Sequence, residues 1–282
     1  MTLCYDCALA RGHLPTLFAE FYSVLMKQSE YVAPRILLPV VACIALAAVD
    51  PAHGQPQDTP THGFVSIGGG RQLGGHQFSA NTSLQKFGET AELAIDYMPG
   101  QGGFLDVAGG VRVWHALALG VGFAQFNDTS GIDGIGSVPN PLFFNRPRNV
   151  SFEDTGFEHR QIGINISALY SIPLSDRLIV TISGGPTLFR LRQDLVTDVE
   201  LGAATPPNFD NGEVIATTAT SSNSTGWGGH FGVEGTYLLT EQLGVGAFVR
   251  VTAGSVDLAT ETTSAVVDVG GPQLGAALKL FF

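Results

Sequence analysis

The last ten residues of the chain alternate strictly between apolar and more polar side chains, and this pattern constrains the fold more than any other feature. One face carries Leu274, Ala276, Leu278, Leu280 and Phe282, and the other carries Gln273, Gly275, Ala277 and Lys279. Successive side chains of a β-strand point to opposite faces, so the stretch predicts a strand with one apolar face and one more polar face.

Further segments alternate in the same way. They are 104–114, 115–126, 159–172, 177–188, 227–239 and 243–256. In 159–172, for example, Ile162 and Ile164 oppose Gln161 and Gly163. Together with the terminal strand, these segments give seven strong strand predictions.

The links between these strands alternate in length. Short links are predicted at Trp114-His115, at 173–176 and at 240–242, whereas long polar links are predicted at 127–155 and 195–224, with a shorter one at 257–268. A membrane barrel has short turns at one end and long loops at the other. A soluble β-sandwich would also alternate along its strands, but it has no reason to sort its links by length.

Composition favours the membrane alternative. Only 14% of residues are charged and mean hydropathy is +0.21, yet beyond the N-terminal region no apolar run approaches the roughly 18–20 residues of a transmembrane helix. A chain that is apolar on average but never continuously so fits a barrel, in which lipid-facing and lumen-facing residues alternate. The sequence therefore predicts an all-β fold, a transmembrane antiparallel up-and-down β-barrel.

Seven strands require at least one more, because bacterial single-chain barrels have even strand numbers. Two weaker segments, 63–72 and 86–97, are the candidates. We predict eight strands, with 63–72 as the first and 86–97 as part of an extended first loop or hairpin above the membrane. The opposite assignment of these two segments stays open.

The N-terminal region has the pattern of a secretory signal peptide. The apolar run 36–49 follows Lys27 and Arg35, and Ala52-His53-Gly54 provides small residues for cleavage. We predict an N-terminal extension and cleaved signal peptide at 1–54, a short periplasmic lead at 55–62 and the barrel at 63–282. Lipoprotein processing at Cys43 is the alternative, and Met26 is an alternative start.

Charge and cysteine content exclude several classes of function. After residue 54 the chain has 11 basic and 21 acidic residues, a net charge of −10, which disfavours nucleic acid as a partner. All three cysteines precede residue 55, so no disulfide is predicted in the exported chain. The histidines form none of the usual ligand spacings, and we predict neither a metal nor another cofactor.

From about residue 63 onward the chain resembles the outer-membrane β-barrel-domain proteins, the group of small OmpA-like, OmpW-like and opacity-type barrels. The resemblance rests on the signal peptide, the rhythm of strands and links, the tight turns at 170–177 and 237–242, and terminal Phe282. It implies that Leu278, Leu280 and Phe282 form a signal read by the barrel-assembly machinery. It also implies an outer-membrane location, contact with lipid and lipopolysaccharide, periplasmic chaperones during biogenesis, and long links outside the cell.

Polar residues on the predicted lumen face are the first candidates for function. They are Asp106, Arg112, His230, Glu234, Arg250 and Lys279. In a narrow barrel such charges must pair or lose their charge. A structural plug of salt bridges is the main interpretation, because eight strands leave an interior just filled by side chains. A polar path for ions or a small solute, or a catalytic cluster, are the alternatives.

The segment 139–148 is the second candidate, because its three prolines, two phenylalanines and two arginines stand apart from polar surroundings. One hypothesis is a loop that folds back over the barrel mouth and buries Phe143 and Phe144. The other is an exposed recognition element for a surface partner or for lipopolysaccharide phosphates, in which Arg146 and Arg148 supply charge.

These patterns predict an outer-membrane barrel with a structural or surface-interaction role that displays long extracellular loops on a plugged barrel. A narrow channel or transporter for small or apolar solutes is the alternative. Enzymatic activity is not predicted, because the chain has none of the Ser/His or Asp/His signatures expected of small barrel enzymes.

Overall fold

A computed structural model describes residues 62–202, 212–261 and 263–282. The predicted signal peptide at 1–54, the alternative lipid site at Cys43 and most of the lead at 55–62 lie outside the described residues. Among the described residues, no helix is long and apolar enough to cross a membrane.

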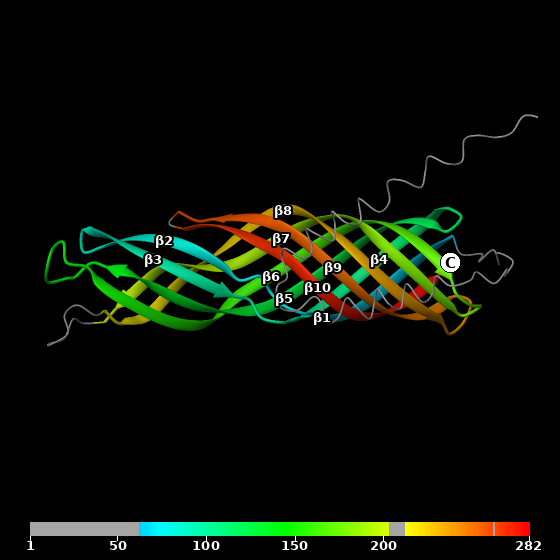
Figure 1. Cartoon of the computed structure of the whole chain (residues 1–282), viewed down its shortest axis with the longest axis horizontal. Coiled ribbons are helices and arrows are strands. Elements are labelled where there is room, and N and C mark those ends of the chain that lie inside the picture. The colour runs from blue at the N-terminus through cyan, green and yellow to red at the C-terminus, as the bar shows by residue number, and fades with distance from the viewer. Residues whose placement is uncertain (1–61, 203–211, 262) are drawn as a thin grey trace, which may run out of the picture. The chain divides into compact units, whose positions relative to one another are not determined.

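The described chain consists of ten antiparallel strands (Figure 1). They are β1 (Gly63–Gln72), β2 (Phe78–Lys86), β3 (Glu89–Met98), β4 (Gly103–Trp114), β5 (Leu117–Val138), β6 (Arg148–Pro173), β7 (Leu178–Leu201), β8 (Val214–Leu238), β9 (Leu243–Ala259) and β10 (Thr263–Phe281). The seven strong strand predictions are all present, and β1 has the bounds predicted for the first strand.

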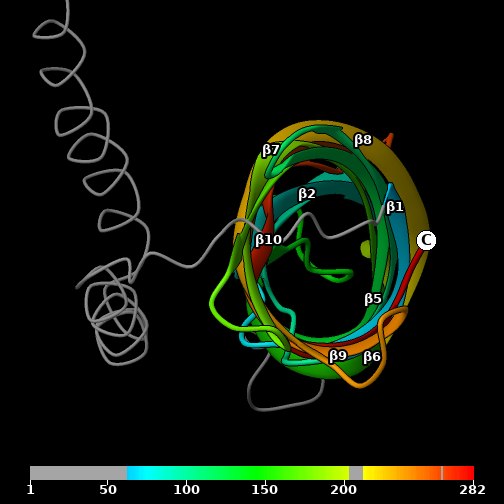
Figure 2. The same ribbon diagram turned by 90° about the vertical axis from the view of Figure 1, so that its right-hand side faces the viewer.

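The strands close into a ring, which Figure 2 shows in end view. At the end with the short turns the order is β1–β4–β5–β6–β7–β8–β9–β10, and β10 pairs back onto β1. This ring has eight members, as the sequence predicts. The 174–177 and 239–242 turns and the β4–β5 turn lie at this end, and both Gly63 and Phe281 lie there too.

Ten strands occupy eight positions because two positions are each built from two strands. β1 pairs with β10 as far as Gln72, and β2 then continues the same position by pairing with Ser264 and Thr263. In the same way β4 pairs with β5 up to Phe126, and β3 pairs with β5 from Gly131 onward. The β2–β3 hairpin therefore extends the wall of the barrel, in agreement with the predicted hairpin above the membrane.

The predicted long links are mostly strand, and this expectation was wrong. β5 and β6 stay paired until Val138 meets Arg148, and β7 and β8 stay paired until Leu201 meets Val214. The 257–268 link is also strand except for the turn around residue 261. Alternation continues through these segments, but the exposed side becomes polar, so the segments look like polar links when only the outward residues are noticed.

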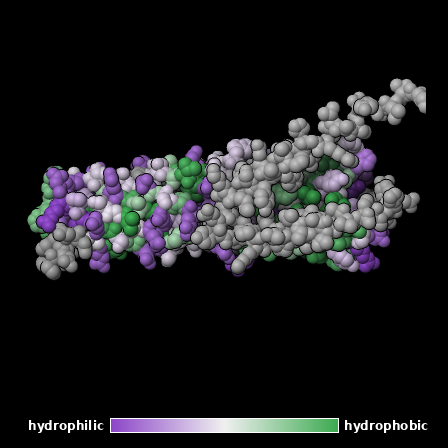
Figure 3. All heavy atoms as spheres, viewed as in Figure 1, coloured by the Kyte–Doolittle hydropathy of each residue, from purple (hydrophilic) through white to green (hydrophobic). Residues whose placement is uncertain are grey.

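The barrel has two parts that differ in which kind of side chain faces outward and which faces inward. We call the part that contains the short turns the turn half. The other part, which contains the loop Pro139–Pro147, is the loop half. The boundary between them passes through Gln125, Arg160, Arg190, Thr225, Ser255 and Gly270. In the turn half large apolar side chains face outward, including Val65, Ile67, Leu105, Val107, Leu119, Val121, Phe123, Ile164, Ile166, Leu274, Leu278 and Leu280. In the loop half many hydrophilic side chains, interspersed with apolar ones, lie on the face that the left side of Figure 3 shows.

The interior of the loop half is a conventional hydrophobic core. It contains Phe78, Leu84, Leu93, Ile95, Tyr97, Ile132, Val138, Val150, Phe157, Leu191, Leu195, Val196, Val199, Val256, Leu258, Val267 and Val269. Burial of each such Leu, Val or Phe side chain contributes about 1.5–3 kcal/mol. The loop half is thus held together by apolar packing in the same way as a soluble β-protein.

Candidate functional site

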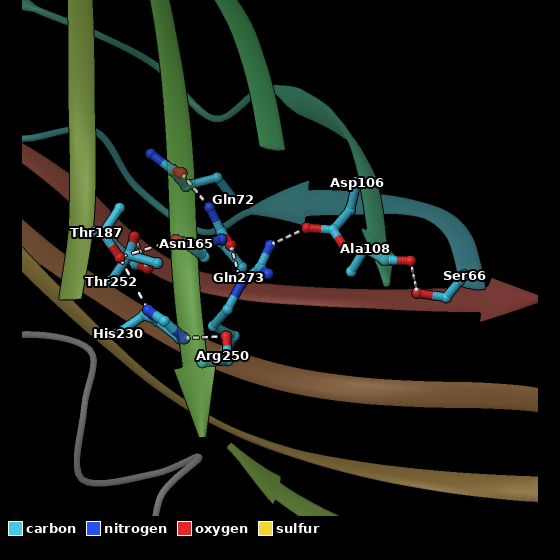
Figure 4. A network of polar contacts seen from close by, with 12 residues as sticks. Ser66, Gln72, Asp106, Ala108, Asn165, Thr187, His230, Arg250, Thr252 and Gln273 are labelled. Carbon is cyan, nitrogen blue, oxygen red and sulfur yellow. Dashed lines mark hydrogen bonds and ion pairs between the residues drawn. The ribbon is translucent and has the colours of Figure 1, made fainter. Parts of the chain in front are cut away.

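The lumen of the turn half is crossed by an ion pair between β4 and β9. Asp106 and Arg250 face each other across the interior, with Arg250 Nη2 donating to Asp106 Oδ2 at 2.6 Å (Figure 4). The Arg250 guanidinium also lies over the rings of Phe104 and Phe248. Both charged side chains are nearly buried, and a buried pair of this kind is retained only where geometry and further hydrogen bonds are good.

Two glutamines extend this network along the barrel wall. Arg250 Nε donates to Gln273 Oε1 at 2.8 Å, and Gln273 Nε2 donates to Gln72 Oε1 at 2.9 Å. Gln72 Nε2 in turn donates to the Gly270 carbonyl at 2.8 Å. Four side chains from four strands thus form a continuous chain of hydrogen bonds across the lumen (Figure 4).

A second ion pair lies closer to the short turns. Lys279 Nζ is 2.6 Å from Glu234 Oε1 and lies 4.7 Å from the centre of the Phe64 ring. Thr236 donates its hydroxyl to the same carboxylate oxygen. The lysine side chain is almost fully buried, so this pair links β10, β8 and β1 across the interior.

His230 forms a separate uncharged cluster. Its Nε2 lies 2.9 Å from Ser167 Oγ, and its Nδ1 lies 2.9 Å from Thr187 Oγ1. Thr187 donates to Asn165 Oδ1 at 2.8 Å. Both ring nitrogens therefore have hydroxyl partners, and the imidazole links β8 to β6 and β7 (Figure 4).

The structure brings together five of the six residues predicted for the lumen, in three groups. Arg112, the sixth, lies near the end of β4 on the same face of the strand as Asp106, and its side chain is exposed. Its part in the lumen network stays a prediction. The network also includes neutral residues that were not singled out, among them Gln72, Gln273, Asn165 and Thr187. Their place in the alternation of the strands could have identified them, because they occupy the same inward-facing positions as the charged residues.

The lumen of the loop half is closed by the β7–β8 hairpin. After Gln193, β7 no longer pairs with β6. Likewise, the part of β8 that precedes Gly228 does not pair with β9. The β7 strand of this hairpin instead packs its apolar side chains into the core and contacts β2 and β10. The result resembles two sheets packed face to face more than an open tube.

Val196 fastens this hairpin to the surrounding wall. β7 has a register shift between Val196 and Asp198, and the Val196 N–H donates to the Tyr97 hydroxyl at 2.8 Å. The Val196 carbonyl accepts longer hydrogen bonds from Thr82 and Thr263, whose hydroxyls are 2.8 Å apart. Burial raises the pKa of Tyr97 to about 12. Both polar backbone atoms of Val196 are thereby satisfied inside an apolar core.

A histidine lies at the junction of the two halves. His159 Nδ1 is 2.6 Å from Gln193 Oε1, and its ring meets Phe126 edge to face. Burial lowers the pKa of His159, against smaller opposing effects of the Gln193 hydrogen bond and of the Asp128 carboxylate. The imidazole is accordingly held neutral near pH 7.

The loop Pro139–Pro147 forms the tip of the loop half between β5 and β6. Phe143 is 44% exposed and Phe144 is 76% exposed, so the hypothesis that the loop buries them over the mouth was wrong. Arg146 lies over the Phe143 ring at 5.6 Å, and the Asn145 N–H donates to Glu89 Oε1 at 2.9 Å. The latter bond ties the loop to the neighbouring β2–β3 hairpin.

Arg148 does not belong to this exposed group. It is the first residue of β6, lies on the inner face of the strand and is 1% exposed. Its assignment to a surface recognition element was therefore wrong. The strand begins at Arg148, within the segment predicted as the 127–155 link and eleven residues before the strand predicted at 159–172, and alternation then directs Arg148 inward.

The outer face of the loop half carries two adjoining grooves, which share Glu92 and Ser137. The larger has a volume of about 730 Å³ and lies over β2, β3, β5 and β6, with Asn81, Ile135 and Asn149 in its lining. The smaller, about 340 Å³, reaches the tip loop. Among the described residues no cluster of three His, Cys, Asp or Glu side chains could hold a metal ion.

The apolar exterior of the turn half has the dimensions of a bilayer core. Aromatic residues mark its edges, with Trp227 at one edge and Tyr237, Tyr170 and Trp114 at the other. Trp227 and Tyr237 are ten residues apart on β8, and ten residues of a strand tilted at about 45° span about 25 Å along the axis. That is the height of the outward apolar band of membrane barrels. The chain is a transmembrane β-barrel.

This architecture is that of bacterial outer-membrane proteins, which places the barrel in the outer membrane. Leu278 and Leu280 of the terminal strand face outward within the apolar band, and Phe282 is 59% exposed beside them. The terminal residues thus have the orientation expected of the assembly signal, and their recognition by the assembly machinery stays a prediction.

No protein-family model and no curated protein matches this sequence. Solved outer-membrane barrels have a similar fold. Neisserial surface protein A is 18% identical with a TM-score of 0.38, and the match covers 78% of this chain and 97% of that one. The outer membrane protease OmpT from Escherichia coli is 10% identical with a TM-score of 0.46, covering 79% and 98%. Outer membrane protein AlkL is 13% identical with a TM-score of 0.29, covering 82% and 92%. The likeness extends to the class of fold.

Proposed function

We propose that this protein is a closed outer-membrane barrel whose role is surface interaction through the rigid loop half. In this role the turn half anchors the protein in the bilayer, and the loop half holds the tip loop and the grooves away from the membrane. The role is a binding role without catalysis. A narrow channel is the alternative.

The filled interior is the single observation that carries the proposal. In the turn half, the Asp106–Arg250 and Lys279–Glu234 pairs cross the lumen, and each is fixed by further hydrogen bonds or ring contacts. In the loop half, the β7–β8 hairpin fills the lumen with apolar side chains. A solute would have to displace both layers, which supports a closed barrel.

The exposed tip supports a contact function. Leu142, Phe143 and Phe144 are 61%, 44% and 76% exposed on one loop, and apolar groups left in water at a single place commonly mark an interaction site. The loop is held by the Glu89 hydrogen bond and by its prolines, so little ordering entropy would be lost when a partner binds.

Conductance in a planar bilayer tests the closed lumen. We expect the membrane-purified protein to insert without discrete current steps, insertion being verified by a heat-sensitive gel shift. Reproducible steps would establish an open path and replace this proposal with the channel alternative. Arg250→Gln and Glu234→Gln would then change ion selectivity, since these residues line the interior.

Labelling in intact cells tests which end faces outward. The chain has no cysteine after Cys43, so single cysteines report their own position. We expect a membrane-impermeant maleimide to label Phe144→Cys in intact cells and Leu239→Cys only after the outer membrane is permeabilised. The reverse pattern would place the tip in the periplasm and remove the surface role.

Retention of producing cells on an octyl-coated surface tests the tip itself. We expect Phe143→Ser/Phe144→Ser to reduce retention several-fold relative to the unchanged protein. Ile135→Ser/Val266→Ser is the matched control, because both side chains are exposed on the sides of the loop half at 63% and 66%. Equal losses in both variants would mean that the tip has no special part in contact.

A further inference from the structure

Arg148 presents an unmet electrostatic requirement at the loop end of the lumen. It is the largest of the fully buried side chains, and its Nε, Nη1 and Nη2 atoms have no hydrogen-bond acceptor in the part of the chain that the structure describes. A guanidinium keeps its charge at all physiological pH values and presents five donors. Burying such a group without an acceptor is strongly unfavourable.

Two other cations that face the described lumen have acidic partners, whereas partly buried Arg160 has a side-chain acceptor in Gln125 but none for its Nε. Arg250 has Asp106 and Gln273, and Lys279 has Glu234. Asp106 is the only acidic side chain among the buried described residues, and it lies in the turn half. Carboxylates on strands around Arg148 include Glu92, Asp133 and Glu153, which are exposed on the outer face. They cannot serve a group that points inward.

The surroundings of Arg148 strengthen any electrostatic contact there. Val138 is its partner in the β5–β6 ladder, and Val150 is the next inward residue on β6. Gly212 closes the other side: a Cβ at that position would lie 2.6 Å from Val150 and 3.8 Å from the Arg148 Cβ. In apolar surroundings the effective dielectric constant is low, so an anion beside the guanidinium is attracted far more strongly than in water.

We propose that Arg148 binds an anionic group, a carboxylate or a phosphate, belonging to a ligand that enters at the loop end. The guanidinium fork matches the paired oxygens of either group. Arg148 lies one residue inside the loop Pro139–Pro147, so an anion reaches it without crossing the turn half. The site goes beyond the contact role of the tip and does not depend on it.

Thermal stability with simple anions tests the site. The probes are inorganic phosphate and acetate, each compared with sodium chloride at the same ionic strength, on protein purified from membranes. A ligand that binds only the folded state raises Tm, and we expect a rise of about 5 °C near saturation for the unchanged protein. We expect no rise in Arg148→Met. Whichever anion acts identifies the phosphate or the carboxylate class.

Arg146→Met is the matched control, since it removes an exposed arginine from the loop that adjoins Arg148. We expect it to keep the full anion response; loss of the response would mean nonspecific attraction and overturn the site. Without anions, Arg148→Met should melt at or above the unchanged protein, because an unpaired buried charge has been removed. Arg148→Lys, which keeps the charge, should retain a reduced anion response if Arg148→Met does not fold.

A partner within the chain is the competing explanation, and it predicts different results. Asp210 lies outside the described residues and offers a carboxylate close in sequence to Gly212. If Asp210 were the partner, Asp210→Asn and Arg148→Met would each lower Tm, and the double variant would lose no more than one of them. That pattern, or no response of the unchanged protein to either anion, would overturn the proposal.

Discussion

The turn half and the loop half are built on the same eight strand positions, yet the polarity of their inward-facing and outward-facing side chains is reversed. β10 illustrates the change within one strand: Val267 and Val269 face inward in the loop half, and Gln273 and Lys279 face inward in the turn half. The parity of the strand never changes. The environment on the outer side changes from water to lipid, and the side chains that must be hidden change with it.

The two halves also differ in how they hold polar groups. The interior of the turn half contains charges in pairs, whereas the interior of the loop half has polar contacts at single points, such as Tyr97 with Val196, and one buried cation, Arg148, without an acceptor among the described residues. Removal of a polar partner should therefore cost most where the partner left behind is charged. The following predictions test this contrast, from the largest expected effect to the smallest.

Asp106→Ala should have the largest effect. It leaves the Arg250 guanidinium buried without its carboxylate, and breaking a buried pair in this way costs about 3–5 kcal/mol of unfolding free energy. Guanidinium chloride unfolding of the protein in detergent measures the loss. Asp106→Ala/Arg250→Met should recover most of it, because no unpaired charge remains. A loss below about 1 kcal/mol in the single variant would mean that water reaches the pair.

A lysine on the outer surface separates the two environments directly. Ile166→Lys places a charge in the apolar band and should cost about 2–4 kcal/mol. Val266→Lys is the matched variant on the outer face of the loop half, where the side chain is 66% exposed to water, and it should change stability by less than about 0.5 kcal/mol. Equal costs would contradict the placement of the band edge between these positions.

Tyr97→Phe tests the fastening of the β7–β8 hairpin. The Val196 N–H would lose its acceptor inside an apolar core, at a cost of about 1–3 kcal/mol. In an absorbance titration at 295 nm, Tyr97 should ionise only near pH 12, and Tyr97→Phe should remove that late step. If Tyr97→Phe left the titration curve unchanged, the hydroxyl would not be buried.

The junction histidine should give the smallest effect. The pKa of His159 is lowered in the folded state, so the unfolded chain binds a proton more readily. Stability from this residue is complete above the ordinary histidine value of about 6.5 and falls as pH drops below it. Unfolding at pH 7.5 and pH 5 measures the change, and His159→Gln should flatten it. A steeper acid loss in His159→Gln would reverse the assigned sign.

Strand positions could be predicted from sequence because parity is a local property. The outward set Leu274, Leu278 and Leu280 needs no knowledge of partners, and β1 was identified with its observed bounds. The long hairpins were missed because their strands alternate with the same period of two as a membrane strand, but with the apolar residues on the inner face and the polar residues on the outer face. A search for alternation of either sign would have found Leu195 and Val199 facing inward.

The candidate sites were predictable only in part. Parity placed Asp106, Arg250, Glu234, Lys279 and His230 inside, but parity does not say which of them meet. Arg250 reaches Asp106 across 144 residues of sequence, a contact set by strand order and stagger. Arg148 was assigned to the surface because 127–155 was predicted as a long link, whereas β6 begins at Arg148 and the alternation of the strand turns this side chain inward.

The sequence by itself determined the class of fold, the closed sheet of eight positions and the residues that face lipid, because these follow from the period of two and from the solvent on each side. Only the tertiary structure decided that the long links continue as strands, that the β7–β8 hairpin fills the loop half, and that Arg148 points into an apolar interior. These features depend on contacts between segments far apart in the chain, and the free energy of such contacts is not written in any one segment.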